Sequence, residues 1–304
     1  MHTENNNDKR SLMAIPEPIP LYPTYAELNE IDFNEFQQLK SFLCSDEPWW
    51  LQHWKWGHEF LRYIGRNKSE HTYIRFRGET ERFLLWAFLI KKTPIDRLGK
   101  SDILEYADFC WHPPESWICL TNHEKFQFQN GVYTVNKSWA PFRLKLPKTD
   151  LPEKPDKKKY KPSQQTLTST FTAITAFYKY MMSEEHLYGN PAQIAKADCR
   201  HFIQDSQVKE VRRLTDDQWQ YVMAVALKLA NDNELFERNL FVISALKTLF
   251  LRVSELSERK NWMPTMSHFW EDSDGNWWLK IFGKGRKIRD ITVPENFITY
   301  LKRY

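Results

Sequence analysis

The sequence is poor in cysteine and glycine, and it has no long apolar run. Only 4 of its 304 residues are cysteines and only 9 are glycines. Cysteines scattered so widely do not form a disulfide framework, and they suit a reducing cytosol. The longest uncharged apolar run, Phe83–Ile90, is far shorter than the roughly twenty residues that a membrane span needs. The polar N-terminus, MHTENNNDKR, is not typical of a secretory signal. We therefore expect a soluble cytoplasmic protein with no membrane partner.

The chain also lacks a strong net charge. Its 43 basic and 39 acidic residues give a formal charge of +4 at neutral pH. A total this small does not identify a nucleic-acid partner, so the distribution of charge must do so. Positive charge gathers in a proline- and lysine-rich loop over 148–163 (KTDLPEKPDKKKYKPS) and in the stretch 280–289 (KIFGKGRKIR). The apolar fraction of 41% is that of a folded protein.

Apolar spacing predicts a mainly helical chain that ends in a small antiparallel sheet. Residues 1–24 hold several prolines and no periodicity, so they are expected to be a loosely ordered arm. Apolar stripes and helix boundary signals predict helices over 69–110 with a break at Pro94, over 167–181, over 216–230 behind a capping box at Thr215 and Gln218, and over 237–250. Strands are expected over 132–135, 277–282 and 287–293, where apolar residues alternate and turn residues intervene.

Arg252 and Glu255 stand just after the buried helix at 237–250. If that helix continues, residues three apart share one face, so the two side chains are expected to lie together. Such pairs are also common on helix surfaces, where they serve solubility alone. The pair therefore leaves a functional and a structural interpretation open.

The second cluster is the basic hairpin around Lys284, which lies between Gly283 and Gly285. Glycines on both sides let a lysine occupy the tip of a turn without backbone strain. There it can reach a groove or a reaction centre, while Arg286, Lys287 and Arg289 add a local positive field. The alternative is a solvated hairpin end, because edge strands use lysines against aggregation. The flanking glycines weigh against that alternative.

Together, LFLRVSEL (249–256) and, 32 positions after Arg252, the hairpin lysine of GKGRKIRDITVP (283–294) resemble the tyrosine recombinase (phage integrase) family. The helical stripe over 167–181, closed by Gly-Asn-Pro at 189–191, resembles the last helix of that family's core-binding domain. The resemblance covers roughly residues 70–304 and is strongest over 160–304. It implies a mainly α fold: a flexible arm (1–32), a helical, SAM-like core-binding domain (33–205) that carries the basic loop, and a partial α+β integrase catalytic domain (206–304) with a small antiparallel sheet.

The resemblance also implies roles for single residues. The position of Arg252 contacts the scissile phosphate, Glu255 matches a supporting acid, and Lys284 matches the general acid that protonates the leaving 5′-hydroxyl. The family breaks and rejoins duplex DNA through a 3′-phosphotyrosine, as a homotetramer at a synapse in the bacterial cytosol or nucleoid. It uses no metal, no cofactor and no small-molecule substrate.

The sequence departs from the family pattern after the hairpin. No second arginine box and no matching nucleophile follow, and neither Tyr300 nor Tyr304 fits the spacing of the nucleophile. We therefore expect this chain to bind DNA without cleaving it. The alternatives are a non-catalytic DNA-binding relative that competes for recombination sites and, less favoured, a helical scaffold for protein partners.

Two weaker signals remain. Under the recombinase interpretation, the run formed by Lys157, Lys158, Lys159 and Lys161 is expected to neutralise DNA backbone phosphates. Cys110, His112, Cys119 and His123 are potential zinc ligands within one short segment. Their spacing differs from the paired cysteines of structural zinc sites, so a fortuitous cluster in a tryptophan-rich region is expected and no metal site is predicted.

Overall fold

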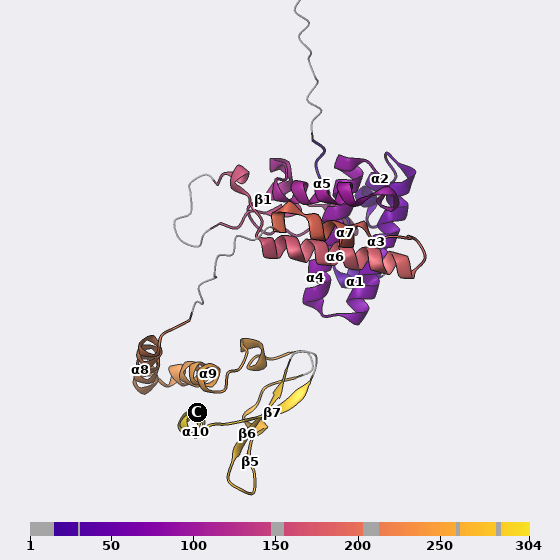
Figure 1. Ribbon diagram of the computed structural model, residues 1–304. Coiled ribbons are helices and arrows are strands. Elements are labelled where there is room, and N and C mark those ends of the chain that lie inside the picture. The colour runs from indigo at the N-terminus through magenta and orange to yellow at the C-terminus, as the bar shows by residue number, and fades with distance from the viewer. Residues whose placement is uncertain (1–14, 30, 147–154, 203–212, 260–261, 284–286) are drawn as a thin grey trace, which may run out of the picture. The chain divides into compact units, whose positions relative to one another are not determined.

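The computed structural model describes residues 15–29, 31–146, 155–202, 213–259, 262–283 and 287–304 (Figure 1). The chain divides into two compact units, residues 1–207 and 208–304. Each unit encloses its own hydrophobic core. The fold is mainly α-helical with small sheets, which confirms the fold class predicted from the sequence. In the described ranges, no helix is long and apolar enough to cross a membrane.

Unit 1 is a bundle of helices in which α3, α4 and α6 pack against one another (Figure 1). Its α-helices are α1 (Tyr25–Asn29), α2 (Gln37–Leu43), α3 (Pro48–Asn67), α4 (Glu70–Leu85), α5 (Lys100–Trp111), α6 (Gln164–Ser183) and α7 (Pro191–Asp198). A π-helical turn (Trp86–Lys91) extends α4 until Lys92 takes a left-handed conformation. The apolar stripe predicted over 167–181 is the buried face of α6, and Ser163 caps that helix by accepting from the Thr166 N–H.

The N-terminal segment is packed, contrary to the prediction of a loose arm. Leu21 and Tyr22 are fully buried, and Leu28 of α1 joins the same core. The backbone N–H groups at 21 and 22 donate to the Glu81 carboxylate at 2.7 and 3.2 Å. The prolines do prevent a helix here, but an extended segment can still bury its side chains when a distant residue satisfies its backbone. The prediction of a flexible arm over 1–32 is therefore wrong at residues 20–23 and in α1, whereas residues 15–17 are exposed and residues 1–14 lie outside the described ranges.

The described part of unit 1 also contains two short strand pairs. Strand β2 (Phe126–Gln129) pairs antiparallel with β3 (Val132–Val135), as predicted for 132–135, through an Asn130–Gly131 turn. Both turn residues have positive φ, 52° and 82°, which asparagine and glycine tolerate best. Strands β1 (Ile118–Cys119) and β4 (Phe142–Arg143) form a parallel pair.

Within its described residues, unit 2 combines three α-helices with one antiparallel sheet. Its elements are α8 (Asp216–Asp232), α9 (Glu237–Thr248), β5 (Phe269–Glu271), β6 (Trp277–Phe282), β7 (Ile288–Thr292) and α10 (Glu295–Arg303). The capping box predicted at Thr215 and Gln218 opens α8, and the predicted hairpin is the β6–β7 pair. Phe241 of α9, Ile281 of β6 and Phe297 of α10 meet in the core, so the sheet is held on these two helices.

Candidate functional site

The chain turns sharply between α9 and Arg252. Helix α9 ends at Thr248, and Phe250 is 88% exposed with a φ of 51°. Leu249 and Leu251 are both buried on either side of it. In a continuing helix these two side chains would point about 200° apart, so burying both requires the helix to stop. Helix α9 therefore does not continue through Arg252 and Glu255, so the condition under which they would share a helix face is not met.

Arg252 and Glu255 nevertheless lie together, through a different local structure. Arg252 precedes a short 3₁₀ turn (Val253–Glu255) and acts as its N-cap. The backbone N–H of Arg252 donates to Oε2 of Glu255 at 2.9 Å, and its Nη1 donates to Oε1 at 3.1 Å. The Glu255 carboxylate thus fixes both the backbone and the side chain of Arg252.

Arg289 reaches the same carboxylate from strand β7. Its Nη2 donates to Oε1 of Glu255 at 3.2 Å. The Glu255 side chain is 1% exposed, whereas the side chains of Arg252 and Arg289 are 60% and 49% exposed. Two guanidinium groups therefore share one buried carboxylate, with a net charge of +1. Each arginine has further N–H donors, and this arrangement can bind an anion at the surface.

The hairpin turn begins beside this cluster. A Cβ placed on Gly283 would lie 3.2 Å from Nη1 of Arg289 and 3.6 Å from Oε1 of Glu255. The Gly283 N–H donates to the Lys287 carbonyl at 2.8 Å, which closes the base of the turn, and the Lys287 side chain is exposed. Lys284 and Arg286, both predicted site residues, lie outside the described residues. We name the set of Arg252, Glu255 and Arg289 the arginine site.

The predicted lysine segment lies in unit 1, ahead of α6. Lys157 donates to the Glu115 carbonyl at 3.3 Å, and Lys158 Nζ lies 3.8 Å from the Glu115 carboxylate. Lys161 Nζ stands 5.6 Å from the Trp111 ring centroid, and Lys159 is exposed. These contacts leave the lysine side chains at the surface, where they can meet an anionic partner.

Three of the four potential zinc ligands, Cys110, Cys119 and His123, have other partners. Cys110 is buried, and this burial raises the pKa of its thiol to about 12. The Cys119 thiol donates to the Phe142 carbonyl at 3.2 Å, and His123 contacts Thr121. Within the described ranges, no three metal-ligating side chains gather. The two C-terminal tyrosines are packing residues: Tyr304 stacks on Phe241 at 4.5 Å, and Tyr300 is partly buried against the core.

Sequence reasoning did not find that Arg289 contacts Glu255. It placed Arg289 among residues that meet DNA, and that role stays a prediction. The contact depends on the register of the hairpin, in which Arg289 faces Ile281 across the strands. Residues 287 and 289 alternate with Ile288, so period-two spacing could have placed them on one face, but the partner 34 residues away could not be read locally.

No protein-family model matches the sequence, and no curated protein matches it. Among solved structures, the fold is similar to that of the XerH site-specific recombinase bound to its difH substrate in a pre-cleavage complex. The TM-score is 0.42 and the sequence identity is 13%, and the alignment covers 92% of this chain and 64% of that chain. The chain therefore spans less than two thirds of the length of that recombinase.

Proposed function

We propose that this chain binds duplex DNA and is part of a site-specific recombinase of the tyrosine recombinase type. The observation that carries the proposal is the arginine site: Arg252 and Arg289 share the buried Glu255 and keep further donors at the surface. A guanidinium fork matches two oxygens of one phosphate and keeps its charge at any working pH. The site is thus suited to holding a backbone phosphate.

The roles within the proposed reaction are those that the resemblance to the tyrosine recombinases implies. Arg252 stabilises the charge that develops on the scissile phosphate, and Glu255 positions the Arg252 side chain. Lys284, which lies between Gly283 and Gly285 in the sequence, protonates the leaving 5′-hydroxyl. Strand cleavage through a 3′-phosphotyrosine belongs to a complete homotetrameric enzyme that also supplies the second arginine box and the nucleophile. No metal, cofactor or small-molecule substrate takes part.

Arg289 belongs to the arginine site, and the other basic residues are proposed to contact DNA away from the reacting phosphate. Residues 33–205 form the core-binding part of the proposal and residues 206–304 the catalytic part. The phosphate-contacting side chains in this proposal are Lys157, Lys158, Lys159, Lys161, Arg286, Lys287 and Arg289. Interactions of this kind give affinity and salt dependence without reading sequence.

Duplex DNA binding, followed by fluorescence anisotropy across a salt series, tests the proposal. Changing both site arginines (Arg252→Gln with Arg289→Gln) is expected to weaken binding by about tenfold or more and to lower the salt slope by about one for each phosphate that is no longer neutralised. The double variant Lys40→Gln/Lys196→Gln removes the same charge from exposed positions on α2 and α7 and serves as the control. An equal loss of DNA affinity in the arginine variant and in the lysine control variant would contradict a specific arginine site.

The lysine segment and the cleavage step have separate tests. Replacing Lys157, Lys158 and Lys159 with alanine is expected to lower the salt slope, and an unchanged slope would remove these residues from the interface. Incubation with a nicked suicide substrate is expected to give no covalent adduct with this chain. A protein–DNA adduct would show that a nucleophile is present after all.

A further inference from the structure

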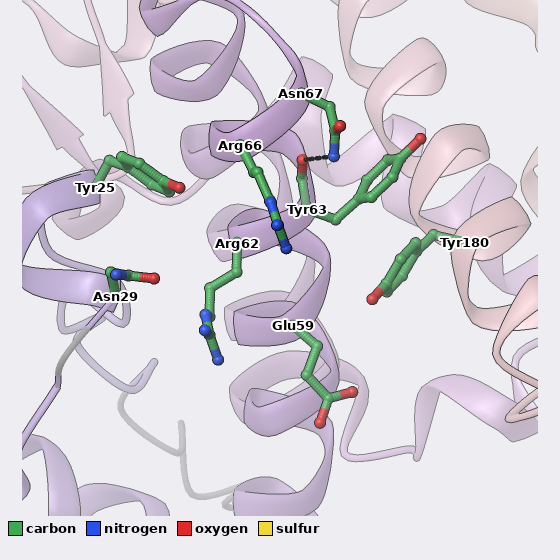
Figure 2. Close-up of a pocket in the computed structure, with 8 residues that line it drawn as sticks. All are labelled: Tyr25, Asn29, Glu59, Arg62, Tyr63, Arg66, Asn67 and Tyr180. Carbon is green, nitrogen blue, oxygen red and sulfur yellow. Dashed lines mark hydrogen bonds between the residues drawn. The ribbon is translucent and has the colours of Figure 1, made fainter.

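Unit 1 contains a hollow of about 750 Å³ that the sequence did not signal (Figure 2). It lies between α1, the C-terminal half of α3 and the end of α6. The residues around it are Tyr25, Asn29, Glu59, Arg62, Tyr63, Arg66, Asn67 and Tyr180. Its volume falls within the range of about 300–1,000 Å³ that small-molecule sites occupy. We call it the tyrosine hollow.

The wall on the α1 side is held by close packing. A Cβ placed on Gly65 would lie 2.2 Å from the Tyr25 ring, so that ring rests directly on the backbone of α3. Tyr25 also meets Tyr73 edge to face, with ring centroids 5.2 Å apart. Only glycine at position 65 allows this approach. The hollow therefore has one wall that is fixed before any ligand arrives.

Two arginines extend between the walls. Arg62 and Arg66 are one helical turn apart on α3, and both side chains reach into the hollow (Figure 2). Within the part of the chain that the structure describes, neither forms an ion pair. The carboxylate in the same hollow, Glu59, lies 3.8 Å from Nε2 of His186. Two unpaired guanidinium groups at helical spacing form a receptor for an anion with several oxygens.

The opposite wall is aromatic. Tyr63 is 44% exposed, and its ring stacks on Tyr180 with centroids 5.1 Å apart. Burial and the nearby Glu184 and Glu59 carboxylates raise the pKa of Tyr180, so its hydroxyl stays neutral and can donate. The same two rings border a second hollow of about 470 Å³, which also has Lys68 and Lys179 along its edge.

We propose that the tyrosine hollow binds a nucleotide, with its phosphate on Arg62 and Arg66 and its base against Tyr63. Phosphate oxygens suit the paired guanidinium groups, and a base suits an exposed aromatic ring beside them. A duplex carries its phosphates on a rigid convex surface, whereas a recess between helices admits a flexible strand or a free nucleotide. The bound nucleotide can therefore belong either to a single strand or to a free mononucleotide. The proposal is separate from the arginine site and does not rest on it.

Binding to the full chain tests this inference with two probes, a short fluorescent oligothymidylate and AMP. The double variant Arg62→Gln/Arg66→Gln is expected to weaken binding of whichever probe the hollow takes by about tenfold or more. The variant Lys40→Gln/Lys196→Gln, which removes the same charge elsewhere in unit 1, is expected to leave it unchanged. Saturable binding of AMP identifies the free nucleotide as the source, and binding of the oligonucleotide alone identifies the strand.

A neutral substitution separates stacking from charge. Tyr63→Leu is expected to weaken binding of the nucleotide probe by several fold, because it removes base–aromatic stacking, while binding of inorganic phosphate stays the same. Arg252→Gln/Arg289→Gln is expected to lower duplex affinity and leave the nucleotide probe unaffected, so the two sites fail independently. The inference is overturned if neither probe binds, if the control variant weakens binding as much, or if polyglutamate competes as well as the oligonucleotide.

Discussion

Each unit buries a carboxylate that is held by hydrogen bonds, and Glu81 of unit 1 and Glu255 of unit 2 have different kinds of partner. In unit 1, Glu81 accepts from the buried backbone at Leu21 and Tyr22 and from Lys125 at 2.5 Å, whose side chain is only 14% exposed. In unit 2, Glu255 accepts from two arginines that are half exposed. The first cluster neutralises its charge inside the unit. In the second cluster, the remaining N–H donors of the two arginines face solvent, where a ligand can reach them.

The largest expected effect is that of removing the Glu81 charge. Glu81→Gln leaves the Lys125 ammonium without a counter-charge in a shielded position and weakens the contact that holds the N-terminal segment. Breaking a buried pair in this way costs about 3 to 5 kcal/mol. Hydrogen exchange of the full chain, read separately over α3 and over β6, measures the free energy of opening in each unit.

The matched variant is Glu255→Gln, which also neutralises a buried carboxylate. Its arginine partners can turn to water, so the expected cost is about 1 kcal/mol and is confined to unit 2. Glu255→Gln could lower the hydrogen-exchange protection of β6 as strongly as Glu81→Gln lowers that of α3. Hydration of the two arginines would then not replace the interaction that they lose with the Glu255 carboxylate. The contrast between the clusters would then be wrong.

Acid is expected to act on unit 1 through His53. Burial among aromatic rings lowers the pKa of His53 from 6.5 to about 4, despite the attraction of Asp96 at 3.5 Å. The folded state then binds fewer protons than the unfolded state between these values. Its stability therefore falls as the pH drops through 6.5 towards 4, by about 3 kcal/mol.

The variant His53→Gln isolates this effect. It lacks the titrating ring, so the part of the acid dependence that His53 contributes is expected to disappear, while burial also lowers the pKa of His58, whose contribution remains. Exchange rates over α3 at pH 7 and pH 5 give the comparison, after correction for the intrinsic rate. An equal pH dependence in wild type and variant would show that His53 does not carry the linkage.

Local signals predicted much of this architecture. The stripe of α6, the capping box at Thr215 and the β6–β7 hairpin each depend on residues within a few positions of one another. The end of α9 was misplaced because Phe250 leaves the helix so that Leu249 and Leu251 can both be buried, and their burial depends on the core of the whole unit.

The sites depend on contacts that are distant in sequence. Glu81 meets the backbone of Leu21 60 residues away, and no pattern in the proline-rich segment indicates that partner. Glu255 could be proposed from its spacing to Arg252, but its contact with Arg289 needs the folded hairpin. The tyrosine hollow needs three helices brought together. The sequence therefore indicated the local pair of Arg252 and Glu255, but it did not indicate the contacts between residues that are distant along the chain.

A further comparison, with an expected effect as small as that of Glu255→Gln, concerns two helix caps. Ser163 caps α6 in unit 1 and Thr215 caps α8 in unit 2, each by accepting from a backbone N–H in the first turn. Replacing either with alanine costs about 1 kcal/mol. The consequences differ because α6 buries a continuous face, whereas α8 buries only Ala226 and Ala230.

We therefore expect Ser163→Ala to lower the protection of unit 1 as a whole, since α6 cannot open without its core. Thr215→Ala is expected to raise exchange over the first turns of α8 alone and to leave β6 unchanged. Exchange resolved by peptide over α6, α8 and β6 distinguishes these outcomes. Reduced protection over β6 in Thr215→Ala would mean that α8 and the sheet open as one unit, and the arginine site would then rest on a larger cooperative structure than its packing indicates.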